Sequence, residues 1–145
     1  MDDRKVLFLC TGNSCRSQMA EGLVNHFLGD QWRAFSAGTK PSGYVHPLAI
    51  EAMTELDIDI SRQRSKSLDE FRDVDLDIVI TVCSGAAEDC PVWLGASEVR
   101  HMGYPDPAEA TGTRGERLEV FRRVRDGLRC DVLRYLKART EGQRR

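Results

Sequence analysis

Short apolar runs alternate along the chain with segments in which apolar residues recur at helical spacing. Residues 6–9 are continuously apolar, which is typical of a strand buried on both faces, and Gly12 with Asn13 ends that run. The apolar positions that would form the next helix face are Ala20, Leu23, Val24, Phe27 and Leu28. The first unit is therefore predicted to be a strand, a tight loop and a helix.

The same alternation continues to the end of the chain. Runs of β-branched and apolar residues predict further strands at 32–37, 77–82 and 98–101. Helical spacing predicts helical segments at 47–56, 67–71 and 116–138. No internal repeat, low-complexity tract or linker divides the chain. We therefore expect one α/β domain over residues 1–145, with a four-stranded parallel sheet flanked by helices.

Composition fits one globular domain and disfavours two classes of function. The chain has 145 residues, 41% of them hydrophobic and 30% charged, which is enough for a core of its own. Twenty-one Lys and Arg against 23 Asp and Glu give a formal charge of -2, which disfavours polybasic binding to nucleic acid or to a membrane. Arginines are dense at 114–139, but acids are interspersed, so we expect the solvated outer face of the last helix.

The N-terminal sequence predicts a cytoplasmic protein. Acids precede the apolar run at 6–9, which lacks both the pattern of a signal peptide and the length of a membrane span. Stable disulfides are rare in that reducing compartment, so the five cysteines need another explanation. They form no C-x-x-C pair and the histidines are scattered, so we expect no metal site. Thiol chemistry remains.

The segment from Cys10 to Arg16 is the most specific signal in the sequence. A cysteine ends a buried strand, five residues follow, and an arginine comes where a helix starts. Loop N–H groups and the positive end of the helix dipole can then surround a tetrahedral oxyanion, and Arg16 can bind two of its oxygens. The same field is expected to favour the thiolate of Cys10, which is the nucleophilic form. The residues expected to bind the oxyanion are Thr11, Gly12, Asn13, Ser14, Cys15 and Arg16.

A candidate proton donor lies in Tyr104-Pro105-Asp106-Pro107. Attack on a phosphate-like centre needs an acid to protonate the leaving oxygen. Asp106 lies between two prolines, which stiffen its backbone, and it follows a predicted strand, where the active-site loops of parallel sheets lie. We expect Asp106 to be this acid, and an ordinary Asp-Pro turn is the alternative interpretation.

These motifs resemble the low-molecular-weight tyrosine phosphatase superfamily and, within it, the thioredoxin-coupled arsenate reductases. The resemblance covers nearly the whole chain and rests on residues 10–22, on Asp57-Ile-Asp-Ile-Ser61 and on Asp106-Pro107. The phosphatase branch usually has proline after the Arg-Ser pair, where this chain has Gln18. The resemblance implies a low-molecular-weight phosphatase-like fold, arsenate reduction, and no bound cofactor.

Two further cysteines, Cys83 and Cys90, separate reduction from phosphoryl transfer, which has no use for them. The resemblance implies that Cys10 attacks arsenate, that Cys83 attacks the Cys10 sulfur as arsenite leaves, and that Cys90 then attacks Cys83. Thioredoxin would reduce the resulting disulfide from outside. In this scheme Ser17 donates a hydrogen bond to the Cys10 thiolate, and Asn13 holds the shape of the loop.

Joining Cys83 to Cys90 requires a conformational change if the residues between them are helical. Seven residues of helix span about 10 Å, whereas a disulfide needs Cα atoms within roughly 7 Å. Gly85 and Pro91 favour unwinding of residues 84–89.

Two alternative functions remain open at this stage. A phosphatase of the same fold would use the anion loop and Asp106 without the two additional thiols. A protein that senses redox state or binds RNA would use the arginine-rich last helix. For the reductase we expect a monomer that takes arsenate, with phosphate or sulfate as competing anions.

One position departs from the family pattern. Some of these reductases bind potassium behind the anion loop, through residues matching Asn13, Glu21 and Ser36 and through an aspartate. Lys66 occupies the place of that aspartate here. An ammonium group there would repel a cation and could itself neutralise Glu21, so we hypothesise that it replaces the potassium ion. The alternative is that Lys66 points to solvent.

Overall fold

Strands and helices alternate along the chain, as the sequence predicts. The computed structural model describes residues 4–83 and 98–143, with side chains as far as residue 140. Its strands are β1 (Arg4–Cys10), β2 (Trp32–Gly38), β3 (Ile78–Thr81) and β4 (Val99–His101). Its helices are α1 (Arg16–Phe27), α2 (Pro47–Thr54) and α4 (Arg114–Gln143), with the short 3-10 helices η1 (Leu68–Phe71) and η2 (Pro107–Glu109).

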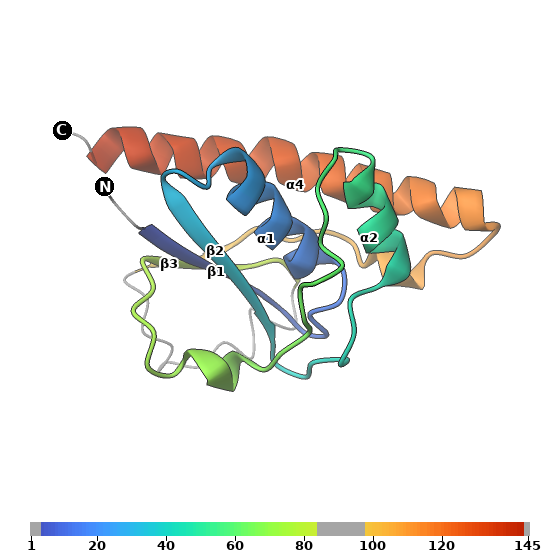
Figure 1. Cartoon of the computed structure of the whole chain (residues 1–145), viewed down its shortest axis with the longest axis horizontal. Helices are drawn as coiled ribbons and strands as arrows, with labels where there is room; N and C mark the ends of the chain where they lie inside the picture. Colours follow the sequence, from blue (N-terminus) through green and yellow to red (C-terminus); the bar gives the residue numbers. More distant parts are fainter. Residues whose placement is uncertain (1–3, 84–97, 144–145) are drawn as a thin grey trace.

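All neighbouring strands pair in parallel, in the order β2-β1-β3-β4. The predicted four-stranded parallel sheet is thus confirmed. α1 packs against β1 and β2, and α4 lies across α1 and α2 (Figure 1). Because parallel strands end at one edge of a sheet, Cys10 and Thr81 close neighbouring strands on the same side.

The apolar patterns identify the core. Residues 6–9 of β1 are fully buried, as expected for a strand covered on both faces. The predicted stripe of the last helix is also buried at Leu118, Phe121, Val124, Leu128, Val132 and Leu136. No helix in the described part of the chain is long and apolar enough to cross a membrane.

α1 begins at Arg16, where the sequence predicted a helix to start. The boundaries of the other two α-helices differ from the predicted ones. α2 ends at Thr54 rather than near Leu56, and Asp57 beyond it adopts a left-handed backbone with φ of 61°. α4 extends past its predicted limits at both ends.

The arginines of α4 do not all face solvent, which corrects the sequence prediction. Arg125 is only 7% exposed and donates to the backbone carbonyl of Ala52 and to Glu55. Arg122 binds the same carboxylate, and Arg114 pairs with Glu51. The basic face of α4 therefore holds α2 in place, a role that charge patterning along one helix cannot reveal.

Candidate active site

The anion loop spans the turn between β1 and α1, where the sequence predicted it. Cys10 ends β1, and Cys15 precedes the first residue of α1, Arg16. No side chain caps that end of α1, so its first N–H groups lack a partner within the helix or from a cap. Together with the helix dipole they give the loop a positive character suited to an oxyanion.

The loop fits closely against the end of β2. Gly38 lies opposite Cys10, and a Cβ atom at Gly38 would lie 2.6 Å from the carbonyl oxygen of Thr11 and 3.0 Å from Cβ of Asn13. Only glycine permits this approach. Asn13 itself has φ of 51°, a left-handed conformation that asparagine tolerates better than most residues.

Arg16 connects the anion loop to the acid loop. Its Nη1 donates to the carbonyl oxygen of Tyr104 at 3.0 Å, and its Nη2 lies 3.8 Å from Oδ2 of Asp106. Its side chain is 11% exposed, and its buried Nε has no hydrogen-bond partner among the described residues. Because an unpartnered buried donor is costly, this Nε is a ready contact for an anion.

Asp106 combines the two interpretations left open by the sequence. Its Oδ1 accepts a hydrogen bond from the backbone N–H of Ala108 at 3.0 Å and so caps η2, as in an Asp-Pro turn. Its other oxygen faces Arg16, and its side chain is 34% exposed. The structure therefore brings Asp106 to the anion loop, where a carboxyl group can reach a departing oxygen.

The side chain of Cys83 contacts that of Cys10, although 72 residues lie between them in the sequence. Both cysteines are buried as free thiols, and their side chains are hydrogen-bonded to each other. Sγ of Cys83 also lies 3.3 Å from Oγ1 of Thr11. Pairing of β1 with β3 produces this contact, because Leu9 lies opposite Thr81 and both cysteines follow at the same edge of the sheet.

The surroundings of Cys10 include groups that raise its pKa, which the loop sequence alone does not indicate. The hydrogen bond to Cys83 and burial raise the pKa of the Cys10 thiol, and the charge of Arg16 offsets this only in part. The neighbours of Cys10 thus oppose the thiolate that the loop favours, and the thiolate stays a prediction. Burial raises the pKa of the Cys15 thiol to about 11, in keeping with a non-nucleophilic role.

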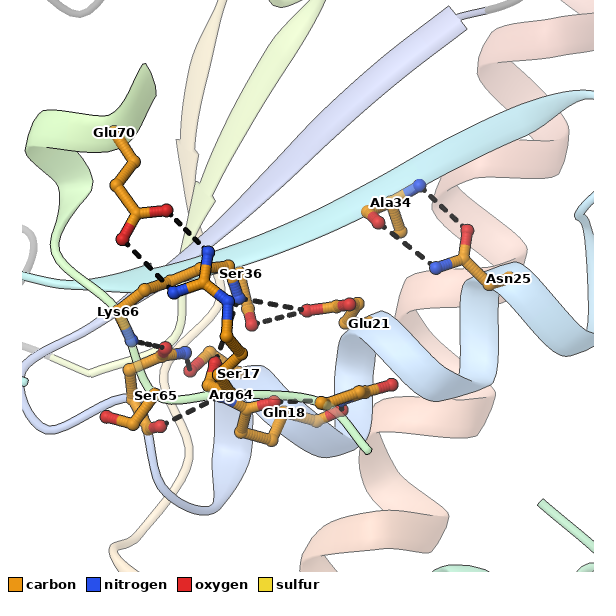
Figure 2. A network of polar contacts seen from close by, with 12 residues as sticks. Ser17, Gln18, Glu21, Asn25, Ala34, Ser36, Arg64, Ser65, Lys66 and Glu70 are labelled. Carbon is orange, nitrogen blue, oxygen red and sulfur yellow. Dashed lines mark hydrogen bonds and ion pairs between the residues drawn. The ribbon is translucent and has the colours of Figure 1, made fainter. Parts of the chain in front are cut away.

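A segment far along the chain braces the loop from behind, and the sequence did not indicate it. Ser65 Oγ donates to the carbonyl oxygen of Gly12, and the backbone N–H of Lys66 donates to Oδ1 of Asn13. Gln18 Nε2 donates to the carbonyl oxygens of Asn13 and Arg64 (Figure 2). Residues 64–66 and Gln18 thus fix the curvature of the loop.

Ser17 is held by the same network. Nδ2 of Asn13 donates to Oγ of Ser17 at 2.7 Å, and Ser17 is fully buried. Because its oxygen accepts this bond, its hydroxyl proton remains for a further acceptor. Donation to a Cys10 thiolate stays a prediction.

Lys66 points into the protein and not to solvent. Its side chain is 11% exposed, and its Nζ lies 3.8 Å from Oε1 of Glu21 and donates to the carbonyl oxygen of Arg64. Ser36 Oγ donates to the same carboxylate (Figure 2). Burial raises the pKa of Glu21, whereas Ser36 and Lys66 lower it in part. The ammonium group thus lies against the carboxylate, as hypothesised from the charge of Lys66.

Cys90 and the segment 84–89, whose unwinding the sequence predicts, lie outside the described residues. Within those residues no three His, Cys, Asp or Glu side chains converge as metal ligands.

Comparisons with known proteins agree with this architecture. The family model for low molecular weight phosphotyrosine protein phosphatase matches residues 5–143. The chain is 49% identical over 126 residues to an arsenate reductase of Halalkalibacterium halodurans, covering 87% of this chain and 90% of that protein.

The solved structures that superpose on this chain also include arsenate reductases. An arsenate reductase in the phosphate binding state superposes with a TM-score of 0.80 at 36% identity, covering 93% of this chain and 98% of that one. A thioredoxin-dependent arsenate reductase of Corynebacterium glutamicum superposes with a TM-score of 0.67 at 26% identity, covering 94% of this chain and 63% of that one. From the extent of the family match and the identity to these relatives, the chain belongs to the low molecular weight phosphotyrosine protein phosphatase family.

Proposed function

We propose that this protein reduces arsenate to arsenite. The observation that carries the proposal is the contact between the Cys10 and Cys83 thiols beside Arg16. A phosphatase needs one thiol in its loop, whereas reduction of an oxyanion needs a second thiol that can attack the first. The similarity to arsenate reductases supports the same conclusion.

Arsenate is proposed to enter the anion loop as a tetrahedral oxyanion. Arg16 Nε and the uncapped end of α1 supply donors for its oxygens. The relative in its phosphate binding state shows that this type of fold accepts such anions. Phosphate and sulfate are therefore proposed as competitors of arsenate.

The first step joins sulfur to arsenic. Cys10 attacks as its thiolate, and a bound arsenate oxygen is a suitable acceptor for the thiol proton. The Cys10 sulfur attacks arsenic, Asp106 gives a proton to the departing oxygen, and water leaves. Arg16 holds the remaining oxygens of the arseno-cysteine.

Reduction follows when Cys83 attacks the Cys10 sulfur. A sulfur-sulfur bond forms, the sulfur-arsenic bond breaks, and its electron pair stays on arsenic, which leaves as arsenite. The proton of the Cys83 thiol passes to an arsenic-bound oxygen. The proximity of the Cys83 thiol to Cys10 supports this step. Cys10 and Cys83 are then joined by a disulfide.

Cys90 and thioredoxin complete the proposed cycle. Attack of Cys90 on Cys83 would free Cys10 and leave a Cys83–Cys90 disulfide for thioredoxin to reduce. The thioredoxin-dependent relative supports this choice of reductant. The electrons then come from outside, and no bound cofactor is needed.

The deciding experiment measures arsenite release with thioredoxin, thioredoxin reductase and NADPH. Cys10→Ser, Cys83→Ser and Cys90→Ser are each expected to abolish turnover, whereas Cys130→Ser, at an exposed position, should retain it. Full turnover by the Cys90→Ser protein with thioredoxin would contradict the three-thiol relay. Full turnover by Cys83→Ser would contradict reduction through the observed thiol contact.

Phosphatase activity is a second candidate because the family match favours it and because Cys10, Arg16 and Asp106 suffice for it. Cys83→Ser and Cys90→Ser are expected to keep slow hydrolysis of an aryl phosphate, and Cys10→Ser to lose it. A protein that hydrolyses the phosphate rapidly and releases no arsenite would be a phosphatase.

A further inference from the structure

A hollow beside α4 lies at the opposite end of α1 from the anion loop. α1 runs from Arg16 at the loop to Phe27 at the hollow, a helix length of about 18 Å. The hollow has a volume of about 810 Å³, within the range of roughly 300–1,000 Å³ that is usual for small-molecule sites. It is therefore separate from the residues that the proposed chemistry uses.

Three apolar residues, together called the apolar floor here, line the hollow and come from separate parts of the fold. Phe27 ends α1, Leu56 follows α2, and Leu133 belongs to α4. The remaining lining residues are on α4 and are Arg125, Asp126, Arg129, Cys130, Arg134 and Lys137. Residues 126, 129, 130, 133, 134 and 137 recur at helical spacing, so one stripe of α4 faces the hollow.

The wall of the hollow carries uncompensated positive charge. Among the described residues, no carboxylate pairs with Arg129, Arg134 or Lys137. The acid in the lining, Asp126, is engaged by Arg125 at 2.9 Å. This accumulation of cations contrasts with the formal charge of -2 of the chain.

Two of the lining cations are held in place by neighbours that leave their charge available. The guanidinium carbon of Arg129 lies 4.8 Å from the centre of the Phe27 ring, which makes a flat platform. Nη2 of Arg134 donates to Sγ of Cys130 at 3.2 Å. Neither contact neutralises a guanidinium, so both arginines can still bind an anionic group.

We propose that this hollow binds a small organic anion with an apolar or aromatic body and a carboxylate or sulfonate group. The apolar floor would receive the body, and Arg129, Arg134 and Lys137 would receive the charged group. A bare inorganic anion would leave the floor exposed, and an uncharged apolar molecule would leave the cations without a partner. The proposal does not depend on arsenate reduction.

Fluorescence titration of the full chain tests the proposal with 8-anilinonaphthalene-1-sulfonate. This probe joins an aromatic body to one sulfonate, and saturable binding with one site is expected. Its uncharged analogue, N-phenyl-1-naphthylamine, has the same body without the sulfonate and should bind at least about tenfold more weakly. Equal affinity for the two probes would show that the cations do not contribute, and it would overturn the proposal.

Matched variants locate the binding. Arg129→Gln combined with Arg134→Gln should weaken binding of the sulfonate probe by tenfold or more, because two charged contacts are lost. Arg123→Gln removes a charge from an exposed position of the same helix that does not line the hollow, and it should leave the affinity unchanged. Equal affinities in the wild type and the double variant, or an equal loss in the control, would place the probe elsewhere and overturn the proposal.

Alkylation of Cys130 supplies an independent readout. Cys130 is exposed and lines the hollow, so iodoacetamide should modify it in the free protein, as followed by mass spectrometry of its peptide. Saturating sulfonate probe is expected to slow this modification severalfold. An unchanged rate at saturation would show that the probe does not occupy the hollow.

Discussion

Neighbouring groups shift the pKa of Cys10 in opposite directions, and the balance between them can be tested with a single substitution. The Cys83 thiol and burial raise the pKa of Cys10, and Arg16 lowers it. Cys83→Ala removes the largest of the raising influences and leaves Arg16 in place. The variant is therefore expected to have a lower Cys10 pKa, and alkylation of Cys10 by iodoacetamide should rise at a lower pH than in the wild type.

Cys15→Ala is the matched control for this measurement. Cys15 is buried in the same loop, but it is not among the groups that shift the pKa of Cys10. Its removal should leave the pH dependence of Cys10 alkylation unchanged. An unchanged or higher midpoint in Cys83→Ala would contradict the role assigned to the thiol contact.

Only some of the properties of Cys10 could be predicted from the sequence. The strand, the loop and Arg16 are adjacent along the chain, so their chemistry could be predicted from local spacing. Cys83 is brought to Cys10 by strand pairing, and the burial of both thiols depends on the whole fold. The position of Cys10 in the anion loop was therefore predictable, whereas the effect of Cys83 on its pKa was not.

The contacts that residues 64–66 make with the anion loop could not be predicted from the sequence. The hydrogen bonds of these residues to Gly12, Asn13 and Gln18 join residues 46 to 53 positions apart, and no periodicity or motif marks such contacts. In the sequence, Gln18 distinguished reductases from phosphatases. Its hydrogen bonds to the anion loop and to Arg64 are seen only in the folded structure. Buried polar groups of this kind need specific partners, which local patterns do not encode.

The Lys66–Glu21 pair predicts how the loop responds to monovalent cations. The ammonium already lies 3.8 Å from the buried carboxylate, so a potassium ion beside Glu21 would meet a like charge. The melting temperature and arsenate reduction of the wild type are therefore expected to be equal in potassium chloride and sodium chloride at equal ionic strength. A clear potassium-specific gain in the wild type would refute this.

Lys66→Asp should make the stability of the protein depend on potassium. The substitution replaces the ammonium by a second carboxylate near Glu21, and a bound potassium ion would relieve their repulsion. We expect a higher melting temperature in potassium chloride than in sodium chloride for this variant. Arg62→Asp makes the same charge change at an exposed position four residues earlier and should show no difference between the salts.

At the scale of the whole molecule, the alternation of strands and helices was sufficient to predict the class of the fold and the parallel sheet. It could not predict how α2 sits on α4, because that contact depends on charges from distant segments. Glu55, directly after α2, binds both Arg122 and Arg125. Arg125 is buried and also holds the carbonyl oxygen of Ala52, so the end of α2 is fixed at two points.

This contact makes stability depend on pH in a defined window. Arg122 and Arg125 lower the pKa of Glu55 from 4.5 to about 2, so folding favours its charged form. The stabilisation is fully present above pH 4.5, the value of the free carboxyl, and it is lost as the pH falls toward about 2. Because a third of the Glu55 side chain is exposed, solvent screening limits the contribution to about 1 kcal/mol.

Glu55→Gln should then lower the melting temperature by roughly 2–4 °C at pH 7, as measured by circular dichroism. The difference from the wild type should shrink as the pH is lowered from 4.5 to 2, whereas Glu109→Gln, at an exposed carboxylate, should show no such trend. A difference that stayed constant across this window would mean that Glu55 stabilises the fold by packing and not by its charge.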